Sequence, residues 1–225
     1  MSAETPIAEH AAAHSAEPAF RQHHFVNAEQ QFSTSKLGMW LLLATEILMF
    51  GGLFVGYGLM QSLYPEAWVA GHHHLDRIMG AVNTVFLLVS SYTMVMAVHS
   101  ASTNNKRWTM INLFLTLGFA GGFLVVKYFE YAHKFHDGLL PGRLFSYQGG
   151  GPPQQAMFFG FYFAMTGLHG FHVLVGMGLI IWIMIRAKSG EFSSAYYTPV
   201  DLVGLYWHLV DLIWIYLFPL LYLVS

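Results

Sequence analysis

Five ionisable side chains lie inside long apolar stretches of the sequence: Glu46, His169, His172, His208 and Asp211. His169 and His172 are three residues apart, as are His208 and Asp211, so each pair shares one face of a helix. A histidine and an acid on one face could form a metal ligand with its supporting carboxylate, or a hydrogen-bonded pair that joins two helices. The three histidines could also serve a His-dependent membrane metalloenzyme, although the Glu-x-x-His spacing of di-metal bundles is absent.

Glu46 lies roughly 13 Å from the start of a helix that begins near residue 37, which places it close to the middle of a membrane. An ionisable residue in a spanning helix is costly, so it indicates either a function or a buried partner. Two interpretations stay open: a proton-linked or lipid-linked site, or a neutral carboxylic acid hydrogen-bonded to a neighbouring helix. A proton-coupled transporter built around Glu46 is less favoured, because the sequence lacks interrupted helices in matching halves.

Three further groups of residues have simpler explanations. Glu130 has Lys127 three residues before it and Lys134 four residues after it, a spacing that predicts an ion-pair cluster at the membrane surface. The run of histidines at positions 72–74 is expected in a surface turn, with chance metal affinity rather than a functional metal site, because three consecutive side chains on a helix cannot all face one ion. Trp207 and Trp214 are seven residues apart, so they share a helix face and are expected to be packing residues.

The elements that carry these residues are long apolar runs. About 20 such residues cross a bilayer, and inside lipid the backbone must satisfy its own hydrogen bonds, which requires helices. The sequence therefore predicts an all-α protein, an integral membrane bundle of five transmembrane helices, at about residues 37–62, 77–99, 107–131, 156–186 and 202–224. Residues 1–35 are expected to be a polar, mobile tail, and residues 36–225 the transmembrane domain.

The composition agrees with a membrane protein and excludes several classes. Charged residues make up 10% of the 225 residues, against about a quarter in a soluble domain. Ten basic against 12 acidic residues leave no surplus for binding nucleic acid. The absence of cysteine excludes disulfides, iron–sulfur clusters and thiolate metal sites. With no catalytic, cofactor or metal constellation, we expect a subunit of a larger complex rather than a self-sufficient enzyme.

The distribution of Lys and Arg predicts the orientation. With five spans, the two ends of the chain lie on opposite sides of the membrane. The side of the N-terminus carries Arg21, Lys36, Lys106, Arg107, Arg186 and Lys188, and the other side carries Arg77, Lys127, Lys134 and Arg143. The bias of six against four favours a cytoplasmic N-terminus and a C-terminus outside.

Several motifs together resemble subunit III of haem–copper cytochrome c oxidases. The most specific are MTGLHGFHVLVG at Met165–Gly176 and YWHLVDLIW at Tyr206–Trp214. Others are ATEILMFGGLF at Ala44–Phe54, AVNTVFLLVSS at Ala81–Ser91 and KYFEY at Lys127–Tyr131. Many members have seven helices, and this chain lacks the first two, as the five-helix forms of bacterial quinol oxidases and some bacterial cytochrome oxidases do.

The resemblance implies roles for individual residues. Glu46 matches the family's intramembrane glutamate, which would organise lipids or tune proton entry. The family's other characteristic polar or aromatic residues match Asn83, Thr84, Glu130, His169, His172, Trp207, His208 and Asp211, and Trp214 closes the last motif.

The resemblance also implies a non-catalytic function for this chain. Such a subunit carries no haem, copper or other redox centre, although it is part of an oxidoreductase complex that reduces oxygen. It packs on subunit I, with subunit II and a small subunit IV as further partners, binds phospholipid, and supports proton uptake and turnover stability in the bacterial inner membrane. Alternatives within the family are subunit III of a quinol oxidase and an accessory subunit of nitric oxide reductase.

Overall fold

The computed structural model describes residues 25–141, 145, 152, 154–194 and 196–223. Its long helices are α2 (Ala28–Leu63), α4 (Arg77–Ser102), α5 (Lys106–His136), α6 (Gln155–Lys188) and α7 (Thr198–Phe218). Two short elements, α3 (Pro65–His72) and the π-helical turn η2 (Pro219–Leu223), complete the described part. Five of these helices are long and apolar enough to span a membrane, so the predicted all-α membrane protein is confirmed.

The chain divides into two compact units, Met1–Leu42 and Leu43–Ser225. In the first unit, the described structure is mainly the beginning of α2, which starts well before the predicted residue 37. Asn27 accepts a hydrogen bond from the Gln30 backbone, and the Gln30 side chain accepts one from the Val26 backbone. This is a variant of the capping box, a helix-start signal that the apolar pattern alone does not reveal. Residues 1–24 of the predicted tail lie outside the described residues.

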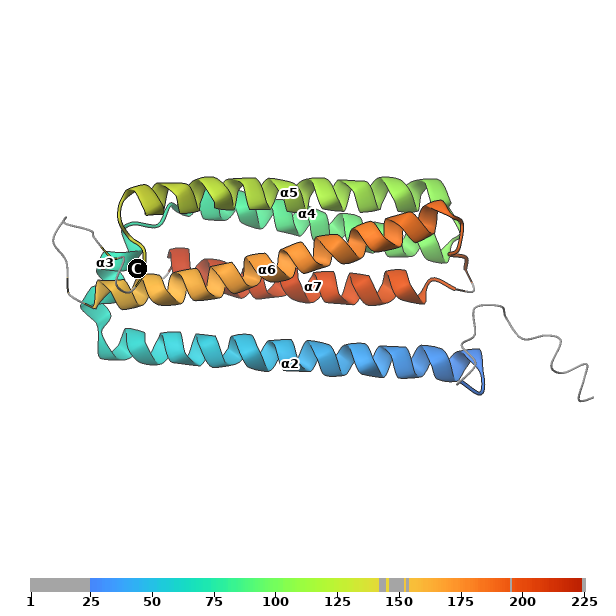
Figure 1. Cartoon of the computed structure of the whole chain (residues 1–225), viewed down its shortest axis with the longest axis horizontal. Helices are drawn as coiled ribbons and strands as arrows, with labels where there is room; N and C mark the ends of the chain where they lie inside the picture. Colours follow the sequence, from blue (N-terminus) through green and yellow to red (C-terminus); the bar gives the residue numbers. More distant parts are fainter. Residues whose placement is uncertain (1–24, 142–144, 146–151, 153, 195, 224–225) are drawn as a thin grey trace, which may run out of the picture. The chain divides into compact units, whose positions relative to one another are not determined.

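In the second unit, α4, α5, α6 and α7 run side by side (Figure 1), and consecutive pairs around the bundle are in contact. Asp76 caps α4 by accepting hydrogen bonds from the backbone amides of Ile78 and Met79. Asn105 caps α5 by accepting one from Trp108. These caps fix the helix starts within a residue of the predicted positions.

The helix α7, which packs against α4 and α6, is the most buried of the five spanning helices. Trp207 and Trp214 are fully buried, as expected for packing residues. A Cβ placed on Gly176 of α6 would lie 2.7 Å from the Trp207 ring, so only glycine lets α6 approach α7 this closely. Pro219 ends α7 at Phe218, and the chain continues as the π-helical turn rather than as a kinked α-helix.

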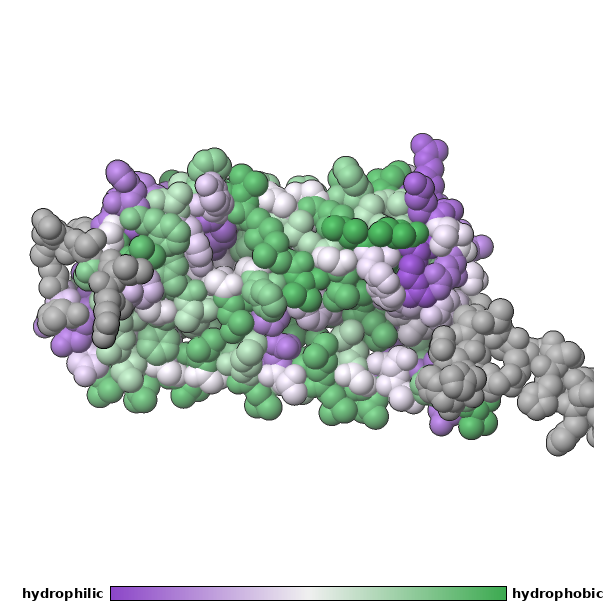
Figure 2. Space-filling view, viewed as in Figure 1, coloured by the Kyte–Doolittle hydropathy of each residue, from purple (hydrophilic) through white to green (hydrophobic). Residues whose placement is uncertain are grey.

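The outer surface is apolar, as a lipid-facing protein requires. Figure 2 shows one face, on which hydrophobic side chains form a broad band while most hydrophilic ones gather toward the two ends of the helices. Large apolar side chains such as Phe114, Phe129 and Ile185 are more than 60% exposed. In water such a surface would drive aggregation, whereas in a bilayer it is solvated by acyl chains.

Candidate functional site

A contact between α2 and α6 joins two of the predicted residues. Glu46 Oε2 and His172 Nε2 are 2.9 Å apart, and the two side chains are 19% and 9% exposed. His172 lies at the midpoint of the 34-residue α6, so the pair sits deep in the apolar span. The Phe50 ring packs edge-on against the imidazole, with centroids 5.4 Å apart. Glu46 therefore has a buried partner on a neighbouring helix, one of the arrangements expected from the sequence.

The protonation of this pair follows from its other hydrogen bond. His172 Nδ1 lies 2.7 Å from the Leu168 carbonyl oxygen, which can only accept, so Nδ1 carries a hydrogen. The Nε2 atom then either accepts a hydrogen bond from a protonated Glu46, or carries a hydrogen itself and donates it to an ionised Glu46. In both cases Glu46 and His172 share one proton along a single 2.9 Å hydrogen bond. Chemically, the pair can hold and pass on a proton.

The second predicted pair does not form. His208 Nδ1 bonds to Ser91 Oγ at 2.8 Å, across to α4, rather than to Asp211. Asp211 is 3% exposed and lies beside Ser91, but neither carboxyl oxygen makes a hydrogen bond of normal geometry with a described residue. The spacing of three residues therefore placed the two side chains on neighbouring positions without pairing them.

His169 and Asn83 are also buried without hydrogen-bond partners among the described residues. The His169 ring is completely inaccessible and packs against Phe123 and Trp214, with centroids 5.5 and 5.2 Å away. Thr84, next to Asn83, accepts a hydrogen bond from the Trp214 indole at 3.0 Å. Trp207 similarly donates to Ser90 at 3.2 Å. Of the Asn-Thr pair, Thr84 therefore holds α7 through a hydrogen bond, whereas the Asn83 amide has no partner among the described residues.

Glu130 is the centre of a dense hydrogen-bonded cluster. Its carboxylate accepts from Lys127 at 2.9 Å and from Lys134 at 3.3 Å, which confirms the predicted ion pairs. The hydroxyls of Tyr162 and Tyr222 donate to the same carboxylate at 2.8 and 2.6 Å. Glu130 is only 1% exposed, so the cluster is buried between helices, and its position at the level of the membrane surface stays a prediction.

His72 connects three elements by hydrogen bonds, a role that the sequence did not predict. It is 6% exposed, its Nδ1 donates to the Leu221 carbonyl at 2.6 Å, and its Nε2 contacts the Tyr57 hydroxyl at 3.2 Å. Burial lowers the pKa of His72 from its ordinary 6.5, and Arg77 and His73 act in the same direction, while the Leu221 hydrogen bond opposes them. His72 is the last residue of the helix α3, which begins at Pro65, whereas His73 and His74 form the expected turn after it and His73 is exposed.

The described residues contain no group of three or more His, Asp or Glu side chains placed to hold a metal ion. The three imidazoles of the metalloenzyme hypothesis have different surroundings. His172 is hydrogen-bonded to Glu46 and His208 to Ser91, whereas His169 only packs against aromatic rings and has no hydrogen-bond partner among the described residues. This geometry does not favour a shared ion.

Comparisons with known proteins give one consistent result. The chain matches the family described as cytochrome c oxidase subunit III over residues 14–225. It is 28% identical to the cytochrome bo(3) ubiquinol oxidase subunit 3 of Pseudomonas putida, covering 84% of this chain and 85% of that protein. It is 30% identical to the cytochrome c oxidase subunit 3 of Thermostichus vulcanus, covering 84% and 87%.

A third relative differs in organisation. The heme-copper oxidase subunit I+III of Aeropyrum pernix is 29% identical over 83% of this chain, a match that covers 22% of that longer protein.

Proposed function

The chain belongs to the cytochrome c oxidase subunit III family, and on that premise we propose that the Glu46–His172 pair sustains proton uptake and turnover in the oxidase. As a family member, the chain is a non-catalytic subunit III of a haem–copper oxidase, a multi-pass membrane protein that associates with subunit I. In Aeropyrum pernix the similar sequence is named as part of a fused subunit I+III.

The observation that carries the proposal is the 2.9 Å contact between Glu46 Oε2 and His172 Nε2. A carboxyl and an imidazole joined by one 2.9 Å hydrogen bond in an apolar span can exchange a proton without leaving a bare charge in the hydrocarbon. The same hydrogen bond also holds α2 against α6, so a change in the protonation of the pair would also affect the packing of these two helices. In the proposal, haem and copper stay in the partner subunits, subunit II and a small subunit IV complete the complex, and phospholipid binds to this chain.

The test is the Glu46→Gln variant in the purified oxidase complex. The Gln side chain keeps a hydrogen bond to His172 but cannot exchange a proton. We expect normal assembly and initial activity, and a several-fold fall in the number of turnovers before inactivation. Glu66→Gln is the matched control, because Glu66 is exposed on α3, outside the spans. An unchanged number of turnovers in Glu46→Gln would reject the proposed role of the pair.

We also propose that the chain lies in the bacterial inner membrane with its N-terminus in the cytoplasm. Lys127 and Lys134 are buried in the Glu130 cluster, so they no longer count as loop charges, and the bias toward the N-terminal side becomes stronger. Because the chain has no cysteine, single Ser189→Cys and Glu66→Cys variants report the two sides with a membrane-impermeant maleimide. Labelling of Glu66→Cys alone in intact cells is the expected result, and the reverse pattern contradicts it.

A further inference from the structure

The last turns of α2, the end of α3 and the turn η2 meet around the imidazole of His72. His72 is 6% exposed, and the Tyr57 side chain beside it is fully buried. His72 Nδ1 lies 2.6 Å from the Leu221 carbonyl oxygen, and Nε2 lies 3.2 Å from the Tyr57 hydroxyl. The same hydroxyl lies 3.3 Å from the Leu220 carbonyl oxygen. Both side chains therefore bond to η2, across 149 and 163 residues of the sequence.

In the neutral state of His72, the hydrogen positions follow from the acceptors. A carbonyl oxygen can only accept, so Nδ1 carries the hydrogen that bonds to Leu221. Nε2 of the neutral imidazole is then an acceptor, and the Tyr57 hydroxyl is its hydrogen-bond partner among the described residues. The single hydroxyl hydrogen therefore points to Nε2 and is not donated to Leu220.

In the protonated state of His72, both ring nitrogens are donors. Nδ1 keeps its bond to the Leu221 carbonyl, and the new hydrogen on Nε2 is donated to the Tyr57 oxygen. The hydroxyl hydrogen then turns to the Leu220 carbonyl, which is already within hydrogen-bonding distance. The rotation of one O–H bond thus satisfies every donor, and neither ring has to move.

The other surroundings of the imidazole do not stabilise a positive charge. Besides Tyr57 of α2, the titratable or charged groups that face it are Arg77 at the start of α4 and the adjacent His73, and both oppose protonation. The helix α6 contributes the apolar ring of Phe158, whose centroid is 5.0 Å from that of the imidazole. In the described part of the chain no carboxylate bonds to His72, so a proton there depends on the oxygen atoms of Tyr57 and η2.

We propose that His72 is a proton-binding site with hydrogen bonds for both protonation states, because the Tyr57 hydroxyl changes its acceptor from His72 to Leu220 when the imidazole takes up a proton. The proton comes from water at this end of the bundle, and no bond between heavy atoms forms or breaks. Both states keep η2 joined to α2 and α3. With the orientation proposed above, this end lies outside the cytoplasm, so the site responds to the external pH.

The variant Tyr57→Phe tests the role of the hydroxyl. Phenylalanine keeps the ring that packs against Trp68 and Phe158, with centroids 5.5 and 6.3 Å away. Without the hydroxyl, the protonated imidazole has a buried N–H donor with no acceptor, which is more costly than a neutral Nε2 without a donor. The folded pKa of His72 should therefore fall further below 6.5 in the variant than in the wild type.

The measurement is the thermal unfolding of the purified complex from pH 7.5 to pH 4.5. The loss of stability in acid starts at the same pH in wild type and Tyr57→Phe, because the pKa of the unfolded chain sets its start. In Tyr57→Phe the loss should continue to a pH about one unit lower, since a hydrogen bond to a charged group is missing.

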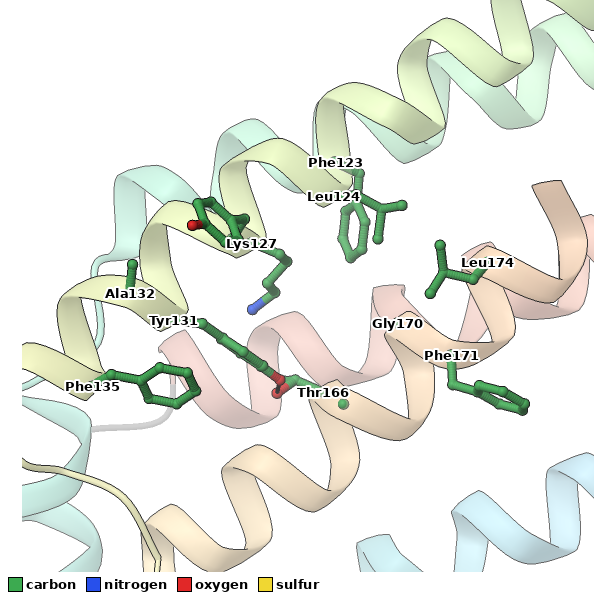
Figure 3. A pocket seen from close by; sticks show the side chains of 12 residues that line it. Phe123, Leu124, Lys127, Tyr131, Ala132, Phe135, Thr166, Gly170, Phe171 and Leu174 are labelled. Carbon is green, nitrogen blue, oxygen red and sulfur yellow. Dashed lines mark hydrogen bonds between the residues drawn. The ribbon is translucent and has the colours of Figure 1, made fainter. Parts of the chain in front are cut away.

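The matched control is Tyr131→Phe. The Tyr131 hydroxyl also joins two helices, but its partner is Thr166 Oγ1, 2.6 Å away, rather than a histidine. Figure 3 shows Tyr131 extending from α5 toward Thr166 on α6. Tyr131→Phe should therefore lower the stability by the same amount at every pH.

Two outcomes would overturn the proposal. One is a profile of stability against pH that has the same shape in Tyr57→Phe and in the wild type. The other is a difference in shape that persists when both proteins also carry His72→Asn, because the hydroxyl then has no titrating partner. The purified complex meets the same buffer on both sides, so an error in the proposed orientation does not affect these results.

A second measurement uses the wild type alone. Deuterium uptake by the backbone of η2, corrected for the intrinsic effect of pH on exchange, should stay the same from pH 7.5 to pH 4.5, because both protonation states hold this turn. Selective loss of protection in η2 at acid pH would show that protonation of His72 breaks the connection, and it would reject the proposal.

Discussion

The buried polar side chains of the helix bundle fall into two sets that differ in how they are satisfied. Around Glu130, two lysines and two tyrosines surround one carboxylate, and His72 uses both of its ring nitrogens. In contrast, His169, Asn83 and Asp211 make no hydrogen bond of normal geometry with the described residues. Removing one member of a satisfied set strands its partners, whereas removing an unsatisfied group strands nothing. Burial alone is therefore a poor guide to how much a polar residue matters for stability.

The largest effect is expected for Glu130→Leu. It leaves two buried ammonium groups without a carboxylate, a change that typically costs about 3–5 kcal/mol. The measurement is the thermal unfolding of the purified complex and the yield of this chain in it.

A surface ion pair provides the control for Glu130→Leu. Glu191, which is exposed and follows the end of α6, pairs with Arg186 in the last turn of that helix through two hydrogen bonds, and surface pairs of this kind contribute about 1 kcal/mol or less. If Glu130→Leu were as well tolerated as Glu191→Gln, the Glu130 cluster would not contribute to stability, and the proposed difference between satisfied and unsatisfied buried groups would be rejected.

A smaller effect is expected for His72, and it depends on pH. Because burial lowers the pKa of His72 below 6.5, the folded chain binds this proton less tightly than the unfolded chain does. Stability is therefore unaffected above pH 6.5 and falls as the pH drops below that value, until the folded pKa is reached. Thermal unfolding at pH 7.5 and pH 5.5 measures this loss.

Two variants sharpen the pH prediction. His72→Asn can still donate a hydrogen bond to the Leu221 carbonyl but does not titrate, so its pH dependence should be flatter than that of the wild type. His73→Gln removes one of the lesser causes of the lowered pKa of His72, so it should flatten the profile less than His72→Asn does. Identical profiles for wild type and His72→Asn would show that another group causes the acid sensitivity.

The smallest effect is expected for the unsatisfied set. His169→Leu removes two ring nitrogens that have no partner among the described residues and keeps an apolar side chain in the same place. We expect the stability of the complex to change by less than about 1 kcal/mol, because loss of packing and gain from removing a stranded polar group offset each other. A loss as large as that of Glu130→Leu would reveal a hydrogen-bond partner from solvent or from another subunit.

Much of the fold could be read from the sequence, whereas the polar contacts could be read only where they are local. Glu130 pairs with lysines three and four residues away on its own helix, and the spacing predicted both pairs. His72 bonds to a carbonyl 149 residues later, and no local pattern indicates such a contact. The burial of Glu130 and His72 could not be predicted, because spacing along a helix says nothing of what covers that face.

The sequence by itself determined five membrane-spanning helices and the family, because apolar runs of this length can satisfy their backbone in lipid only as helices. Only the tertiary structure decided that Glu46 meets His172, 126 residues away, while His208 meets Ser91 rather than Asp211. The physical reason is that helix packing in lipid has no hydrophobic driving force, so close fits of small residues and polar contacts between distant segments choose the neighbours.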